Sequence, residues 1–253
     1  MLNIVLIFEN FDISMLIQLL LIPVYALLLY ILLVVVSAFF VDTTKEYKKD
    51  NPYFRWLITS SAALMTFFLN IRVETTGKEK VPDEHFVLVS NHRSNFDPIL
   101  QWLVLRKGKL AYISKPENFN VPGYGRFIRK CCFLSIDRND PRNSFEVFNK
   151  AIDLLKSGEV SIGVYPEGTR SKQCVLLPFH SGVFKIPQKA NAPLVVMTVT
   201  GTEQIHKNTP FKRTNVHLDI IDVIPAEHIN DMRTNDLCEM VRQEIADHLK
   251  ELG

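Results

Sequence analysis

The feature that most constrains this chain is an uncharged apolar run from Leu16 to Val41. Residues 1–41 contain neither Lys nor Arg, and Glu9 and Asp12 are their only charged residues. About 20 consecutive apolar residues suffice to cross a bilayer as a helix. The run therefore predicts a membrane-spanning segment.

Two alternatives remain for this run. Pro23 lies near its start and can kink a helix, which leaves a re-entrant insertion open. A cleaved secretory signal fits less well, because no basic region precedes the run, which is also longer than the ~7–15 residues of a typical signal core. Four basic residues follow closely, and the positive-inside rule then predicts that the rest of the chain faces the cytoplasm. These residues are Lys45, Lys48, Lys49 and Arg55.

A second apolar stretch, from Trp56 to Leu69, is too short for a typical span. It suits a helix at the membrane interface, or equally a core helix of the following domain. Single domains run up to about 250 residues, so this chain can bury one sizeable core. We expect membrane-anchoring helices in residues 1–70 and one domain in residues 71–253.

The balance of basic and acidic residues bears on which classes of partner the chain can bind. The chain has 29 Lys and Arg against 27 Asp and Glu, for a net charge of +2. This balance does not predict a nucleic-acid partner, because such proteins concentrate basic residues on one face. It suits a surface resting on anionic lipid. The four cysteines lack CxxC spacing, and adjacent Cys131 and Cys132 would point to opposite faces of a strand, so we expect reduced structural thiols.

From Ile71 onward, strand patterns alternate with helix patterns. One helix is predicted from Asp140 as N-cap with Pro141 in its first turn, and the last begins near Thr234. This alternation predicts an α/β fold, with a largely parallel mixed sheet flanked by helices behind the N-terminal membrane segment. The predicted strands are 85–90, 110–114, 132–136, 160–165, 193–200 and 216–224, and the Asp140 helix should bury Phe145, Phe148, Ile152 and Leu155.

A first motif follows the strand at 85–90. His92 leaves this strand, and Asp97 stands five residues later at the mouth of the next helix. An Asp within hydrogen-bond reach fixes the tautomer of a His and raises the basicity of its other nitrogen, which makes a general base. Ser94 is an alternative nucleophile, but it lacks the separately oriented geometry of a triad. We therefore expect direct attack by a bound alcohol.

A second motif follows the strand at 160–165. Gly168 allows close backbone approach, Thr169 offers a hydroxyl, and Arg170 presents a planar fork suited to phosphate. This pattern predicts a phosphate cradle. The alternative is an ordinary turn in which Glu167 and Arg170 form a solvated ion pair.

Together, Asn91-His92-x4-Asp97 and Pro166-Glu167-Gly168-Thr169-Arg170 resemble the glycerophospholipid acyltransferase family, in particular its bacterial 1-acyl-glycerol-3-phosphate acyltransferases. The first motif has the form HxxxxD. The resemblance covers roughly residues 71–199. Residues 113–117, 121–125 and 133–138 resemble the family's second block, and residues 192–196 resemble its fourth, so all four blocks occur in the family's order.

The resemblance implies that His92, oriented by Asp97, deprotonates the sn-2 hydroxyl of a 1-acyl-glycerol-3-phosphate. That hydroxyl attacks an acyl thioester, acyl-CoA or acyl carrier protein, and gives phosphatidic acid for phospholipid biosynthesis without a covalent acyl-enzyme. No metal or other cofactor is implied. The residues implied for the acceptor phosphate are Lys115, Arg138 and Arg170, with Glu167, Gly168 and Thr169 shaping the cradle.

One position departs from the family. His180 stands where the family usually carries a Lys thought to face substrate phosphates, which leaves substrate choice open. The acceptor could therefore be another lysophospholipid. Two alternatives belong to other classes: a hydrolase that uses water at the same base, and a non-catalytic membrane lipid-binding protein on the same fold.

Overall fold

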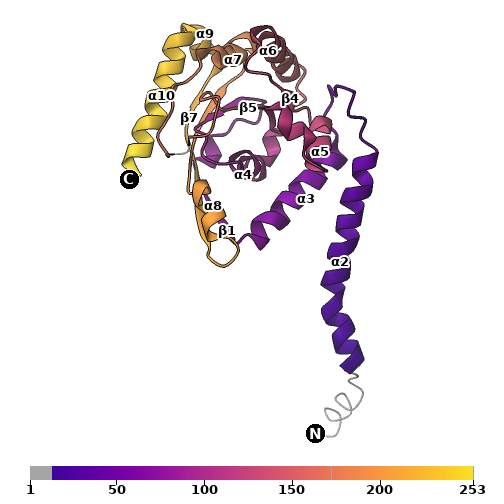
Figure 1. Cartoon of the computed structure of the whole chain (residues 1–253). Helices are drawn as coiled ribbons and strands as arrows, with labels where there is room; N and C mark the ends of the chain where they lie inside the picture. The colour runs from indigo at the N-terminus through magenta and orange to yellow at the C-terminus, as the bar shows by residue number, and fades with distance from the viewer. Residues whose placement is uncertain (1–12, 172, 253) are drawn as a thin grey trace. The chain divides into compact units, whose positions relative to one another are not determined.

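A computed structural model describes residues 13–171 and 173–252 of the chain (Figure 1). The chain forms two compact units, one ending at Asp42 and the other beginning at Thr43. Glu9 and Asp12 lie outside the described residues.

In the described part of the first unit, the chain forms one long helix, α2 (Ile13–Phe39), which continues past Pro23. Within the described ranges, Ser14–Phe39 is the one helix whose length and apolar composition are sufficient to cross a membrane. Its mean hydropathy is 3.0 over the most apolar window, none of which is buried inside the protein. The helix therefore coincides with the predicted membrane segment.

The second unit opens with α3 (Pro52–Phe68). Asn51 caps it by accepting hydrogen bonds from the amides of Tyr53 and Phe54, and Pro52 fits the first turn. The helix buries Phe54, Leu57, Ile58 and Ala62 and packs against α4 and α5. By these contacts α3 is part of the second unit. The core-helix alternative for Trp56–Leu69 describes this packing, and its place at a membrane interface stays a prediction.

The sheet has seven strands in the order β1-β7-β6-β2-β5-β3-β4. Every neighbouring pair is parallel except β6 with β7, so the predicted largely parallel mixed sheet is confirmed. The strand β1 was not predicted. The strands are β1 (Ile71–Thr76), β2 (Val87–Ser90), β3 (Ala111–Ser114), β4 (Leu134–Ser135), β5 (Ile162–Val164), β6 (Leu194–Thr200) and β7 (Thr214–Ile224).

The core lies along β2, β5 and β6, whose residues are almost all buried. Such near-continuous burial is expected of strands covered by helices on both faces. Helix α3 packs with α4 and α5, while α7 packs with α6 and α9 (Figure 1). The helices after α3 are α4 (Asp97–Val104), α5 (Tyr124–Lys130), α6 (Pro141–Lys156), α7 (Lys185–Ala190), α8 (Ile205–Asn208), α9 (Ala226–Asn230) and α10 (Thr234–Glu251).

Short 3-10 helices make several of the connections. They matter to the site because two of them, η4 and η5, follow the second motif and strand β6. They are η1 (Lys78–Lys80), η2 (Arg106–Gly108), η3 (Pro116–Asn120), η4 (Ser181–Phe184) and η5 (Thr202–Gln204).

Two local predictions differ from the structure. The strand predicted at 132–136 is only β4, because Cys131 and Cys132 form a buried turn after α5 and Cys132 has a φ of 61°. The predicted buried face of α6 is confirmed in part, because Ile152 and Leu155 are buried and Phe148 is half-buried. Phe145 is instead 60% exposed, and the helix buries Val147 and Ala151. Of the four cysteines, Cys131, Cys132 and Cys238 are buried free thiols, whereas Cys174 is exposed.

Candidate active site

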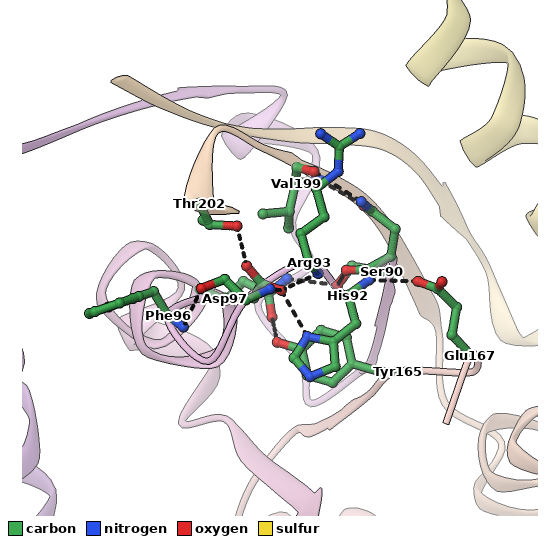
Figure 2. Close-up of polar contacts among 12 residues, drawn as sticks. Ser90, His92, Arg93, Phe96, Asp97, Tyr165, Glu167, Val199 and Thr202 are labelled. Atoms are coloured by element: carbon green, nitrogen blue, oxygen red, sulfur yellow. Dashed lines mark hydrogen bonds and ion pairs between the residues drawn. The ribbon is translucent and has the colours of Figure 1, made fainter. Parts of the chain in front are cut away.

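The first motif lies where the chain leaves β2 and turns into α4. Nδ1 of His92 lies 2.8 Å from Oδ2 of Asp97, the first residue of α4 (Figure 2). A carboxylate only accepts hydrogen bonds, so this contact assigns the proton to Nδ1 and leaves the lone pair on Nε2. The structure thus brings the two residues together in the geometry that a histidine base requires.

Asp97 is completely buried, and its carboxylate accepts three further hydrogen bonds (Figure 2). Its Oδ2 accepts from the amides of Arg93 and Ser94 at 2.7 and 2.8 Å. Its Oδ1 accepts from the hydroxyl of Thr202 at 2.5 Å. These donors compensate for the burial of the charge and hold Oδ2 toward the histidine.

Thr202 reaches Asp97 because the end of β6 is tied to the first motif. The side chain of Asn91 donates to the carbonyl of Val199 at 2.9 Å and accepts from its amide at 2.8 Å. Gly201 then turns the chain with a φ of 87°, in the left-handed region that favours glycine. The turn places Thr202 beside the buried carboxylate.

The ring of His92 also rests on a second aromatic ring. It stacks on Tyr165, with ring centroids 4.0 Å apart and planes 14° apart. The hydroxyls of Tyr165 and Tyr112 both donate to Oε1 of Gln101, at 2.8 and 2.9 Å, and Nε2 of Gln101 donates to Ser90 at 2.7 Å. Burial raises the pKa of both tyrosines well above 10, so they stay neutral donors.

The second motif is fastened to the first through Glu167. Its buried carboxylate accepts from the amide of His92 at 2.6 Å and from the amide of Leu177 at 3.0 Å. The amide of Ser171 donates to the carbonyl of His92 at 2.9 Å. Burial raises the pKa of Glu167. Glu167 therefore faces these amides and holds the loop to the histidine. In the ordinary-turn alternative, it would pair with Arg170 instead.

Gly168 occupies a position that disfavours a side chain. Its φ is +68°, and a Cβ there would lie 3.1 Å from Cδ2 of His180. The amide of His180 in turn donates to the carbonyl of Pro166 at 2.8 Å. Thr169 and Arg170 follow as exposed residues. His180 therefore lies directly against the predicted cradle.

A cavity of about 190 Å³ lies beside the two motifs. Tyr165 lines it and also stacks on His92, so the cavity lies next to the histidine. Its polar lining includes Arg138, Ser144 and His180. Lys115 and Arg170 are exposed and do not line it. The remaining lining residues are Ile113, Ile136, Phe148, Val164, Pro166, Gly168 and Val183.

Ser94, the alternative nucleophile, is buried, and its hydroxyl oxygen accepts from the amide of Phe96 at 3.3 Å. It serves the turn that leads into α4. Across residues 13–171 and 173–252, no group of three or more His, Cys, Asp or Glu side chains is arranged to hold a metal ion.

A family model described as Acyltransferase matches residues 72–200, slightly more than half of the chain. The chain therefore belongs to this acyltransferase family. The structure of the 1-acyl-sn-glycerophosphate acyltransferase PlsC from Thermotoga maritima is similar, with a TM-score of 0.67 and 25% identity over 88% of each chain.

Curated relatives carry a similar description. The 1-acyl-sn-glycerol-3-phosphate acyltransferase of Saccharomyces cerevisiae is 26% identical over 75% of this chain and 64% of its own length. A chloroplastic one from Brassica napus is 29% identical over 87% of this chain and 62% of its own length. The chain thus spans a little less than two thirds of these relatives.

Proposed function

We propose that this chain transfers a fatty acyl group from acyl-CoA or acyl carrier protein to the sn-2 hydroxyl of 1-acyl-glycerol-3-phosphate, giving phosphatidic acid. The observation that carries the proposal is the hydrogen bond between His92 and the buried Asp97. The family membership and the descriptions of the relatives support the same reaction class.

In the proposed reaction, Nε2 of His92 removes the proton of the acceptor hydroxyl as its oxygen attacks the thioester carbonyl. The carbon–sulfur bond then breaks, and the thiolate leaves with the proton returned by the imidazolium. The Asp97 carboxylate, hydrogen-bonded to Nδ1, stabilises that imidazolium. Tyr165 keeps the ring in its plane by stacking against it.

The acceptor phosphate needs a cation near the histidine. Arg138 lines the cavity beside Tyr165, and a guanidinium suits bidentate contact with phosphate. Arg170 and Lys115 are exposed and free to approach a headgroup from outside the cavity. We assign the phosphate to these three cations, with Gly168 and Thr169 shaping the loop that Glu167 holds.

The lipid nature of the acceptor and product places the protein at a membrane. Helix α2 is long and apolar enough to serve as its anchor, and the basic residues after it favour a cytoplasmic position for the second unit. Protease added outside intact cells should spare this unit. Its digestion would show the opposite orientation.

The decisive assay supplies labelled acyl thioester and a panel of lysophospholipids to membranes that contain the full-length chain. We expect labelled phosphatidic acid from the wild type and a loss of at least about 100-fold in His92→Ala. His228→Ala, at an exposed histidine on α9, is the matched control and should keep full activity.

Three results would contradict the proposal. Activity of His92→Ala within a few-fold of wild type would exclude the histidine base. Release of free fatty acid without phospholipid would identify a hydrolase. Binding of lysophospholipid without any turnover would identify a lipid-binding protein.

A further inference from the structure

The loop between α8 and β7, residues 209–213, exposes an aromatic side chain at its tip. Phe211 is 96% exposed, the largest value among the exposed large apolar residues of the described chain. Pro210, Lys212 and Arg213 beside it are also exposed. A phenylalanine so completely in water gains from any apolar surface that covers it.

The end of α3 adds two more aromatic rings to this tip. Phe67 is 76% exposed, and Phe68 beside it is also exposed. Asn70, just after the helix, joins them to the loop: its carbonyl accepts from the amide of Thr214 at 3.1 Å, and its side chain accepts from Arg213 at 3.4 Å. Figure 1 shows the α8–β7 loop and the start of β1 at the same end of this unit.

The same tip is positively charged. Lys207, Lys212 and Arg213 are exposed, and residues 204–218 contain no Asp or Glu. Throughout the part of the chain that the structure describes, no ion pair joins any of these three cations to an acid. Phe67, Phe68 and Phe211 with these cations are called the basic aromatic tip below.

The sheet places the basic aromatic tip at the edge that carries the candidate site. Strands β2 and β6 are parallel, so both end at the edge where His92 leaves the sheet. Strand β7 is antiparallel to β6 and begins at that edge, and β1 begins beside it with Ile71 opposite Thr214. The tip and the histidine therefore share one edge of the second unit.

We propose that the basic aromatic tip inserts into the headgroup region of an anionic bilayer, as a membrane contact separate from α2. Aromatic rings favour the membrane interface, and lysines and arginines near an anionic surface each strengthen binding by about fivefold. The tip combines both chemistries at the edge where a lipid acceptor would arrive. The inference extends the membrane location in the proposed function, but it does not depend on acyl transfer.

The test follows Phe211→Trp by fluorescence in the full-length chain, reconstituted into vesicles of phosphatidylcholine and phosphatidylglycerol. Phosphatidylcholine with brominated acyl chains quenches tryptophans that enter the bilayer. Subtracting the wild-type signal removes the contribution of Trp56 and Trp102. The matched control is Phe145→Trp, which replaces an exposed phenylalanine on α6, away from α8 in Figure 1.

We expect brominated lipid to quench the tryptophan at position 211 several-fold more than the one at position 145. Equal quenching at the two positions would overturn the proposal. The measurement needs no substrate, so the two proposals can fail separately. Selective quenching at position 211 in a chain without acyl transfer would refute the proposed function alone. Acyl transfer without selective quenching at position 211 would refute this inference alone.

A second arm tests the charges. The test adds Lys212→Glu and Arg213→Glu to Phe211→Trp. In vesicles that contain phosphatidylglycerol, this charge reversal should reduce the quenching of the tryptophan. In neutral vesicles, the same charge reversal should change the quenching much less. Lys107→Glu with Lys109→Glu, at exposed lysines before β3, is the control and should leave quenching unchanged. Quenching that is unchanged by the charge reversal and equal in anionic and neutral vesicles would contradict an anionic surface as the partner.

Discussion

The hydroxyl of Thr202 donates a 2.5 Å hydrogen bond to Oδ1 of Asp97, although 105 positions separate the two residues in the sequence. Both side chains are completely buried. The bond fixes one oxygen of the carboxylate, so that the other faces His92. Thr202 therefore acts on the proposed base through the aspartate, without touching a substrate.

We expect Thr202→Val to lower kcat by roughly ten- to a hundredfold, because a hydrogen bond to a charged group contributes about 1.5–3 kcal/mol. The KM values for donor and acceptor should change by only about twofold. Thr202→Ser keeps the hydroxyl and should recover most of the rate. Steady-state kinetics with both substrates checks this. Full activity of the Val variant together with a loss in the Ser variant would show that only the packing of the threonine methyl group matters.

The acceptor phosphate gives a second prediction. Arg138→Ala should raise the KM for the lysophospholipid about tenfold or more with little change for the acyl donor, because it removes the charge-assisted phosphate contact that we propose for this cavity-lining side chain. Arg170→Ala should act in the same direction. Arg233→Ala is the control, since its exposed side chain pairs with Asp236 on α10. Equal effects on donor and acceptor would assign Arg138 to the donor or to the fold.

The third prediction concerns the second motif. Gly168→Ala should destabilise the protein by about 1–2 kcal/mol from the positive φ alone, and the new Cβ also presses on His180. Adding His180→Ala should relieve the contact and restore part of the melting temperature. Gly182→Ala, whose Cβ would lie 3.6 Å from Phe148, is the control. A melting temperature of Gly168→Ala equal to that of this control would refute the steric argument.

The residues of the site that lie close together in the chain could be predicted from the sequence. His92 and Asp97 are close in the chain, so a single loop determines their geometry. Tyr165 directly precedes the second motif, but its stacking on His92 depends on how two neighbouring strands are aligned. Thr202 follows a predicted strand at the edge that carries the motifs, which was the signal available for it. The contact itself required knowledge that β6 lies beside β2.

The fold was predicted less well where packing decides the outcome. The apolar residues of α6 fit two overlapping helical faces equally well. The sequence alone therefore does not show that Val147 faces the core while Phe145 faces solvent. Strand β4 is similarly shorter than predicted, because the chain forms a buried turn at Cys131 and Cys132. The apolar content of a segment does not distinguish a strand from a buried turn. Strand β1 was missed because its exposed face carries Arg72 and Glu74.

The long separation between Asp97 and Thr202 has a consequence for biosynthesis. A ribosome releases α2 first, the histidine loop later, and Thr202 only after most of the chain has been made. Until β6 joins the sheet, Asp97 lacks its Oδ1 donor, and only the local loop holds its carboxylate toward the histidine. The proposed base is therefore completed late in translation, after the apolar anchor has had time to enter a membrane.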